Sequence, residues 1–268
     1  MVVSNQNGVD PLLYDLKQLN FLDISKCTLS DLSDDLGNFT ELTKLSLRHD
    51  SLSRLPASIG CLTNLKFLDI SFNSISALPS SIFADLLHLE TLMIDSNSLT
   101  ELPSLKGLMD LHHLSVSNNS LLYLPESITS CPKLMSIDVS SNKISELSND
   151  FDWGNLANLQ HFNLSNNQLT TVPKTLVECK KLKDLQLREN PLKDSRLKKL
   201  ASSTRPGPAL ISYLAKAGKV DDKSRSKVSK PTQNVVVDRN LKTLVVDSPL
   251  TKDLVIDYNE DDEVNVII

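Results

Sequence analysis

The stretch LKFLDISFN, residues 65–73, contains the pattern on which our fold prediction rests. Leu68 and Ile70 stand two residues apart, and in an extended strand this spacing places both side chains on one face. Asp69, which lies between them, then points to the opposite face. Asn73 follows three residues after Ile70, where its side-chain amide can satisfy backbone groups at the turn. We therefore interpret residues 65–73 as a short strand followed by a turn.

The same pattern recurs along the chain at nearly constant spacing. Its opening leucine occurs at steps of 22–25 residues, at Leu19, Leu42, Leu65, Leu89, Leu111, Leu134, Leu159 and Leu182. The turn position holds Asn73, Asn97, Asn119, Asn142, Asn167 and Asn190, with Cys27 and Asp50 in the first two repeats. One copy cannot bury its own leucines, so the copies must stack and share a core. We expect Asp50 to loosen its turn.

Segments that begin with Leu-Pro or Val-Pro follow the turn in several repeats, at residues 55–59, 78–82, 124–128 and 172–176. Proline fixes φ and suits the start of a short helical segment, which we place on the outer side of each repeat. This combination of features resembles the leucine-rich repeat. The resemblance implies an α/β solenoid of about eight repeats, with a parallel sheet on its concave face.

We divide the chain into five parts by composition and pattern. Residues 1–18 are interpreted as an N-terminal cap and residues 19–207 as the repeats. Residues 208–217 are expected to form a C-terminal cap helix, because Pro208 precedes the apolar residues and Gly218 follows them. Residues 218–234 are a basic flexible linker. Residues 235–268 are rich in β-forming residues but too few for a core of their own, so we interpret them as an incomplete β-rich segment.

The overall composition argues against several classes of protein. The formal net charge of -5 lacks the basic excess of a typical nucleic-acid binder. Cysteines at 27, 61, 131 and 179 have no paired spacing and are expected to be small buried hydrophobic residues in a reducing compartment. The N-terminal residues do not resemble a signal peptide, and the sequence contains no membrane-spanning apolar run. These features predict a cytoplasmic protein, which we expect to be monomeric.

The polar residues do not form a recognisable catalytic motif. The sequence contains no P-loop, GxSxG or HExxH pattern. His113 and His161 share a face, but two strand spacings of about 4.8 Å separate them by roughly 10 Å, too far for one metal ion. The acidic run at residues 259–263 is interpreted as a solvated loop, with a cation site as the alternative. We therefore expect no enzyme activity, no metal and no cofactor.

The outward strand positions carry the information on binding. They contain five aspartates against three basic residues, which favours a protein partner over a phosphate backbone. The alternative is that many of them are merely solvated. The predicted contact residues are Arg48, Phe67, Asp69, Met93, Asp95, His113, Asp138, His161, Asp184 and Arg188.

A more specific resemblance lies at the last repeat. The stretches CKKLKDLQLRENPLKDSRLKKL, residues 179–200, and ISYL, residues 211–214, resemble the leucine-rich-repeat-containing protein 47 family. The resemblance implies a basic linker and then a domain similar to the B3/B4 domain of the phenylalanyl-tRNA synthetase β chain, whose beginning residues 241–246 and 264–268 resemble. Our main hypothesis is a non-catalytic protein-interaction scaffold. The alternative is an RNA- or translation-associated protein with RNA contacts at Lys216, Lys219, Lys223, Arg225, Lys227 and Lys230.

Overall fold

The computed structural model describes residues 13–14, 18–203, 206–225, 243–245, 255–258 and 264–267, with side chains up to residue 216. The chain divides into two compact units, Met1–Asp221 and Asp222–Ile268. The first unit holds the repeats and the second holds the β-rich segment.

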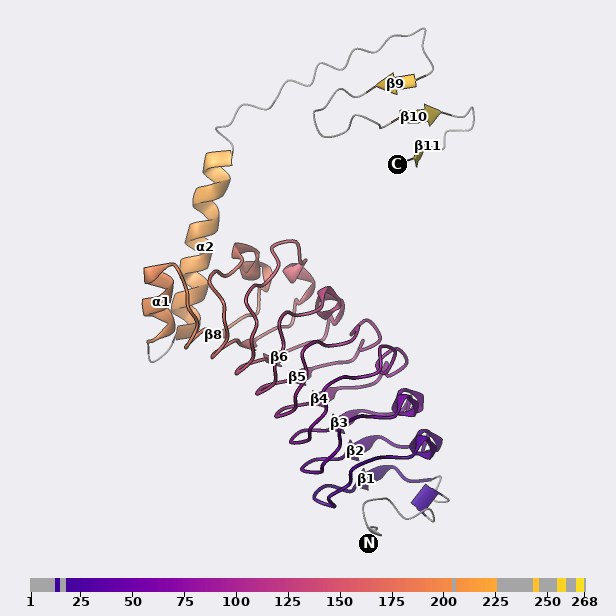
Figure 1. Ribbon diagram of the computed structural model, residues 1–268. Helices are drawn as coiled ribbons and strands as arrows, with labels where there is room; N and C mark the ends of the chain where they lie inside the picture. Colours follow the sequence, from indigo (N-terminus) through magenta and orange to yellow (C-terminus); the bar gives the residue numbers. More distant parts are fainter. Residues whose placement is uncertain are drawn as a thin grey trace. The chain divides into compact units, whose positions relative to one another are not determined.

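Eight parallel strands form one sheet in the order in which they occur in the sequence (Figure 1). They are β1 (Phe21–Asp23), β2 (Lys44–Ser46), β3 (Phe67–Asp69), β4 (Thr91–Met93), β5 (His113–Ser115), β6 (Ser136–Asp138), β7 (His161–Asn163) and β8 (Asp184–Gln186). Each strand begins two residues after one of the predicted opening leucines. The predicted solenoid of eight repeats with a parallel sheet is therefore confirmed.

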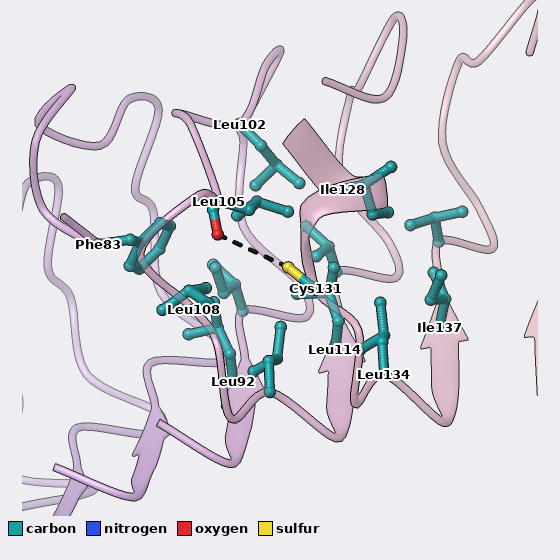
Figure 2. Packing of buried hydrophobic residues seen from close by; sticks show 14 of the residues in the cluster. Phe83, Leu92, Leu102, Leu105, Leu108, Leu114, Ile128, Cys131, Leu134 and Ile137 are labelled. Carbon is teal, nitrogen blue, oxygen red and sulfur yellow. Dashed lines mark hydrogen bonds between the residues drawn. The ribbon is translucent and has the colours of Figure 1, made fainter. Parts of the chain in front are cut away.

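The middle residue of every strand points into a core that the repeats share. These residues are Leu22, Leu45, Leu68, Leu92, Leu114, Ile137, Phe162 and Leu185, and all are buried. Figure 2 shows how Leu92, Leu114 and Ile137 from three successive strands pack in one layer. Because each layer is covered by its neighbours, truncation of one such leucine to alanine is expected to cost about 2–5 kcal/mol.

The asparagine at the turn joins each repeat to the one before it. Asn142 donates through Nδ2 to the carbonyl of Val116 at 2.9 Å and to that of Val139 at 3.0 Å. Its Oδ1 accepts from the backbone N–H of Leu121 at 2.9 Å. One side chain thus satisfies both a donor and an acceptor of the preceding repeat. Equivalent bonds are made by Asn73, Asn97, Asn119, Asn167 and Asn190.

Asp50 keeps half of this arrangement. Its Oδ1 accepts from the backbone N–H of Cys27 at 2.8 Å and of Leu29 at 3.2 Å. Its Oδ2 is buried without a hydrogen-bond partner among the described residues. Burial raises the pKa of the Asp50 carboxyl, against the lowering effect of these backbone bonds. The turn is therefore formed, but the carboxylate lacks the donor that asparagine supplies.

The residue before the turn position has a positive φ of 54–61° in every repeat. These residues are Lys26, His49, Phe72, Ser96, Asn118, Ser141, Asn166 and Glu189. Left-handed backbone is tolerated by asparagine and strained for a bulky residue. The repeat geometry thus imposes this conformation on whichever residue occupies the position.

Short 3₁₀ helices follow the turns in five repeats: η2 (Asp34–Asn38), η3 (Ala57–Cys61), η4 (Glu126–Ser130), η5 (Trp153–Asn155) and η6 (Lys174–Glu178). Pro56, Pro125 and Pro173 each stand directly before a helix, with φ between -68° and -63°. The segment at residues 78–82 forms turns where we predicted a helix.

The last repeat is followed by the short helix α1 (Ser195–Ala201). Asp194 caps it, because its carboxylate accepts from the backbone N–H groups of Arg196 at 2.9 Å and Leu197 at 3.0 Å. Leu197 and Ala201 are buried and extend the apolar core past β8.

The helix α2 (Pro206–Arg225) covers the end of the core with Leu210 and Leu214, which are both buried. It is longer than the predicted helix at residues 208–217. Proline fits the first helical turn, so α2 begins at Pro206. The helix continues through Gly218. A glycine that ends a helix commonly has a positive φ, and no described glycine has one. The first part of the predicted linker is therefore helical.

The second unit contains an antiparallel sheet of three strands in the order β11-β10-β9. The strands are β9 (Thr243–Val245), β10 (Val255–Tyr258) and β11 (Val264–Ile267). All three strands lie within residues 235–268, the segment predicted as β-rich. The predicted β-rich tail is confirmed for these three strands.

The four cysteines differ in their surroundings. Cys131 and Cys179 are buried, and burial raises their pKa values to about 11 and about 12, respectively. The Cys131 thiol donates to the carbonyl of Leu105 at 3.6 Å (Figure 2). Cys27 is half-buried. The prediction of a buried Cys61 is wrong, because Cys61 ends η3 on its exposed side while Ile59 fills the core.

Candidate binding surface on the sheet

The concave surface consists of the outward residues of β1–β8 and the residues that follow each strand up to the turn. It divides into two regions with different chemistry. The first, which we call the aromatic–cation cluster, contains Phe21, Lys44, Arg48, Phe67 and Phe72. The second, which we call the aspartate–serine ladder, contains Asp95, Ser115, Ser117, Asp138, Ser140 and Asn163.

Lys44 lies between two phenylalanine rings at one end of β1–β3. The parallel register aligns Phe21, Lys44 and Phe67 on successive strands. Nζ of Lys44 lies 5.0 Å from the ring centroid of Phe21 and 4.8 Å from that of Phe67. Phe21 is 51% exposed. The stacking holds the ammonium group in place beside open apolar surface, at about 0.5–1 kcal/mol for each exposed cation–π contact.

Arg48 and Phe72 form the other end of the cluster. Cζ of Arg48 lies 4.8 Å from the ring centroid of Phe72, and the His49 ring stacks on the same phenylalanine at 4.3 Å. Phe72 is 40% exposed although its φ is 59°. A large apolar side chain is thus held at the surface by a backbone conformation that it does not favour.

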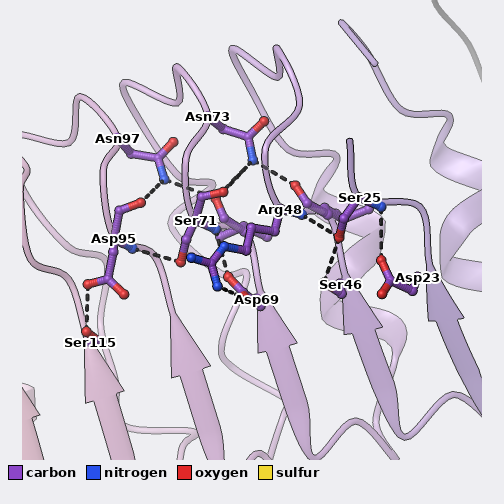
Figure 3. Close-up of polar contacts among 12 residues, drawn as sticks. Asp23, Ser25, Ser46, Arg48, Asp69, Ser71, Asn73, Asp95, Asn97 and Ser115 are labelled. Carbon is purple, nitrogen blue, oxygen red and sulfur yellow. Dashed lines mark hydrogen bonds and ion pairs between the residues drawn. The ribbon is translucent and has the colours of Figure 1, made fainter. Parts of the chain in front are cut away.

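The guanidinium group of Arg48 is only partly paired. Its nearest carboxylate is that of Asp69, with Nη1 and Oδ2 4.0 Å apart (Figure 3). Nε of Arg48 is buried without a hydrogen-bond partner among the described residues. The side chain remains 42% exposed. The exposed part of the side chain, which does not include the buried Nε, can therefore pair with a group from outside.

Asp69, one of the predicted contact residues, is almost fully buried in this chain. The residue is only 5% exposed, and its Oδ1 accepts from the backbone N–H of Ser71 at 2.9 Å. Asp69 lies between Ser46 and Met93 in the sheet register, and Nη1 of Arg48 is 4.0 Å from its Oδ2. Asp69 therefore supports the turn after β3 and offers little contact area to a partner.

The aspartate–serine ladder satisfies its own charges. Oδ1 of Asp95 accepts from Oγ of Ser115 at 2.6 Å, and from the backbone N–H and Oγ of Ser117 at 2.7 and 2.8 Å. Figure 3 shows the Asp95–Ser115 bond, which links β5 to the residues after β4. The carboxylate is used to join neighbouring repeats.

Asp138 follows the same principle two repeats later. Its Oδ1 accepts from the backbone N–H and Oγ of Ser140 at 2.9 and 2.6 Å, and its Oδ2 accepts from Nδ2 of Asn163 at 3.0 Å. Both predicted aspartates are half-buried on the concave face. Oδ1 of Asp95 and both carboxylate oxygens of Asp138 accept hydrogen bonds from within the protein.

The other predicted contact residues do not form one cluster. Met93 is half-buried and His113 is exposed. His161 is also exposed, with its Nδ1 3.8 Å from Oδ2 of Asp184. Ser136 separates His113 from His161 in the sheet register, as expected. Within the parts of the chain that the structure describes, no group of three or more histidine, cysteine or acidic residues is placed to hold a metal.

Arg188 lies at the C-terminal end of the sheet, beside a cavity of about 320 Å³. Its Nη2 donates to the carbonyl of Ser203 at 3.1 Å, which ties the last repeat to the residues after α1. Lys198 and Ser202 line the same cavity. The described bond gives Arg188 a structural role.

The predicted RNA contacts lie in and beyond α2. Lys216 is exposed, and Lys219, Lys223 and Arg225 are placed in the helix by their backbone alone. Lys227 and Lys230 lie outside the described residues. The structure does not bring these residues together into a described surface.

Three members of the aromatic–cation cluster were not among the predicted contact residues. Phe21 and Lys44 are outward strand residues whose contact across neighbouring repeats requires the register. Phe72 stands outside the strand pattern, at the position with positive φ. The available signal was a phenylalanine directly before Asn73, where four other repeats have serine or asparagine before theirs.

Comparisons with known proteins agree with this architecture. Residues 1–104 match the family model described as leucine-rich repeat region, and residues 132–192 match the model described as leucine rich repeat. Together with the eight-stranded sheet, these matches show that the chain is a leucine-rich-repeat solenoid. Among curated proteins, none matches the sequence.

Several solved structures are similar to the chain. A leucine-rich-repeat protein of Leptospira interrogans is 28% identical with a TM-score of 0.59, over 72% of this chain and 55% of that one. The ectodomain of the Arabidopsis thaliana receptor kinase GASSHO1/SCHENGEN3, in complex with CASPARIAN STRIP INTEGRITY FACTOR 2, is 31% identical with a TM-score of 0.62, over 69% and 23%. TLR13 in complex with ssRNA13 is 30% identical with a TM-score of 0.60, over 66% and 26%. The matched part of this chain corresponds to little more than half of the first structure and about a quarter of the other two.

Proposed function

We propose that this chain is a non-catalytic protein-interaction module that binds a partner through its concave surface. The observation that supports the proposal is the aromatic–cation cluster on β1–β3. Exposed aromatic rings and arginine are enriched in protein interfaces and often supply most of the binding energy. Phe72 is 40% exposed at the positive-φ position that every repeat shares, so its ring is available to a partner.

The proposed contact surface combines prediction and structure. It centres on the aromatic–cation cluster, which adds Phe21, Lys44 and Phe72 to the predicted Arg48 and Phe67, and it leaves out Asp69, Asp95 and Asp138. The absence of catalysis is part of the proposal, because the carboxylates of Asp95 and Asp138 are engaged by neighbouring serines and an asparagine.

We further propose that the protein is cytoplasmic and monomeric. All four cysteines are free thiols, as expected in a reducing compartment. Within the described residues, no helix is long and apolar enough to cross a membrane.

The test is affinity capture from a cell lysate with the intact chain and a matched pair of variants. The first variant carries Phe21→Ser and Phe72→Ser. The control carries Leu87→Ser and Met109→Ser, which remove two exposed apolar side chains of similar exposure, 48% and 46%, away from the concave surface. We expect specific proteins to bind the intact chain and the control variant. The amount of these proteins captured by the first variant should be about tenfold lower. Equal capture by both variants would contradict the proposal.

A second candidate is an RNA- or translation-associated role, with membership of the leucine-rich-repeat-containing protein 47 family. It is supported by the resemblance at residues 179–200 and 211–214, and by the existence of a similar structure solved with ssRNA13. Filter binding of RNA across salt concentrations tests it. Salt-dependent binding that is lost when Lys216, Lys219, Lys223 and Arg225 become glutamine would favour this role, whereas RNA binding independent of salt and of these residues would reject it.

A further inference from the structure

We propose that the aromatic–cation cluster recognises an extended, acidic segment of a protein partner, with one carboxylate pairing with Lys44 and a second with Arg48. The inference rests on the proposed function and deepens it, because it names the chemistry that the concave surface selects. Its evidence is the state of the two cations and the spacing between them.

The ammonium group of Lys44 is positioned by rings and not by an acid. Phe21 and Phe67 place it at 5.0 and 4.8 Å from their ring centroids. The charge of Lys44 helps to lower the pKa of the Asp23 carboxyl, but Lys44 and Asp23 form no ion pair among the described residues. The rings also limit the motion of the lysine side chain, so less entropy is lost when an anion binds. Lys44 is thus a preorganised cation beside apolar surface.

Arg48 offers a second cation with unused donors. Cζ of Arg48 lies 4.8 Å from the ring centroid of Phe72, which supports the guanidinium group. Nη1 of Arg48 is 4.0 Å from Oδ2 of Asp69, which is too far for a short charge-assisted hydrogen bond. Arginine can bind a carboxylate through two parallel N–H donors. An external carboxylate can therefore form the pair that Asp69 does not complete.

The separation of the two cations suits an extended peptide. Lys44 opens β2 and Arg48 lies four residues later, so their backbones are at most about 13 Å apart at 3.3 Å per residue. In an extended partner segment, side chains at positions i and i+4 point to the same face over the same distance. Two acidic residues with this spacing can reach Lys44 and Arg48 together.

The same geometry favours a protein segment over single-stranded nucleic acid. Bases bind by stacking on open aromatic faces. Here the ring of Phe72 already stacks on His49 and carries Arg48, while Lys44 lies over the rings of Phe21 and Phe67.

The experiment measures binding of a designed peptide to the full chain by isothermal titration calorimetry. The probe is acetyl-GSLEVTVELSGW-amide, in which two glutamates stand four residues apart. We expect it to bind the intact chain, and the version with both glutamates replaced by glutamine to bind about tenfold more weakly or not at all. Lys44→Gln and Arg48→Gln should each weaken binding of the acidic peptide by about fivefold to tenfold.

Three controls keep the result interpretable. Lys106→Gln removes the same charge at an exposed position outside the concave surface and should leave the affinity unchanged. Arg48→Lys keeps the charge but loses the two-donor geometry, so it should weaken binding less than Arg48→Gln. Thermal unfolding followed by circular dichroism shows whether each variant is folded.

Two outcomes would overturn the inference. The first is equal affinity of the chain for the glutamate and glutamine peptides, or no binding of either. If lysate capture still depends on Phe21 and Phe72, the acidic specificity fails while the proposed function stands. The second is tighter binding of a twelve-nucleotide oligouridine than of the peptide, with loss on Lys44→Gln, which would reassign the cluster to RNA.

Discussion

The first three strands of the sheet and the strands that follow them have the same backbone geometry but use their outward residues differently. On β1–β3, Lys44 lies between two phenylalanine rings, and the Arg48 side chain is 42% exposed with its paired carboxylate oxygen 4.0 Å away. On β4–β7, the carboxylates of Asp95 and Asp138 are taken up by serine and asparagine side chains of the neighbouring repeats.

This difference shows that a residue on the outward face of a strand is not necessarily available to bind a partner. A small hydroxyl two residues after an aspartate closes a local hydrogen-bonded ring, as Ser140 does for Asp138. A long cation next to an aromatic ring remains available to a partner. The ladder should therefore govern stability, and the aromatic–cation cluster should govern binding. Four predictions test this division.

The largest effect is expected from Asn142→Ala in the central repeats. The substitution leaves the backbone N–H of Leu121 and the carbonyl of Val116 without their partner in the core. We expect the free energy of unfolding to fall by about 3–5 kcal/mol, measured by urea denaturation. Ser136→Ala, at a half-buried outward position, should change it by less than about 0.5 kcal/mol. Similar losses for both variants would refute a special role for the asparagine.

Asp95→Ala should lower stability with little effect on binding. It removes three hydrogen bonds from the ladder, and we expect a loss of about 1–2 kcal/mol in urea denaturation. Affinity for the acidic peptide should stay within about twofold, since Asp95 contacts the cluster only through its backbone carbonyl, which accepts from the N–H of Phe72 at 2.8 Å and is kept by the substitution. If the affinity fell sharply while the stability held, the proposed division between the two regions would be wrong.

Asp50→Asn should stabilise the protein at neutral pH. Burial raises the pKa of Asp50, so its contribution to stability is present below the unfolded pKa and is lost as the pH rises through the folded pKa. Asparagine avoids this loss and restores the missing donor, which should add about 1 kcal/mol at pH 7. Urea denaturation at pH 4 and pH 7 should show the gain mainly at pH 7.

Asp23→Asn is the control for this pH dependence. The Ser25 side chain, followed by its backbone N–H, lowers the pKa of Asp23, so its contribution is present above the unfolded pKa and lost as the pH falls through the folded pKa. Its substitution should therefore lower stability at pH 7 and not at acid pH. If both substitutions changed the free energy of unfolding at pH 7 in the same direction, the causes assigned to the two pKa shifts would be wrong.

Phe72→Asn should have the smallest effect on stability and a clear effect on binding. Asparagine adopts the positive φ more readily, which offsets the loss of contacts with Arg48 and His49, so the free energy of unfolding should change by less than about 1 kcal/mol. Capture of the partner should fall. The reciprocal Asn118→Phe, at the equivalent position with φ of 54°, should lower stability by about 1 kcal/mol. Unchanged capture by Phe72→Asn would show that the cluster is not the binding site.

Local spacing allowed most of the fold to be predicted. Each opening leucine marked a strand because burial at every second residue is a property of the strand itself. The turn asparagines were equally visible, and Asn73 and Asn142 make the bonds that their chemistry predicts. The prediction that the helix ends at Gly218 was wrong, because a glycine can adopt either a helical or a helix-ending conformation and residue type alone does not decide between them.

The sequence by itself determined the repeat number, the inward residues and the position of the sheet, because each depends on residues close together in the chain. Only the tertiary structure decided which outward residues are accessible. Phe21, Lys44 and Phe67 are 23 residues apart from one to the next and meet because parallel pairing aligns their strands. Asp69 is buried by its neighbours for the same reason. Contacts between repeats depend on register and on the sizes of adjacent side chains, and neither can be inferred from one repeat.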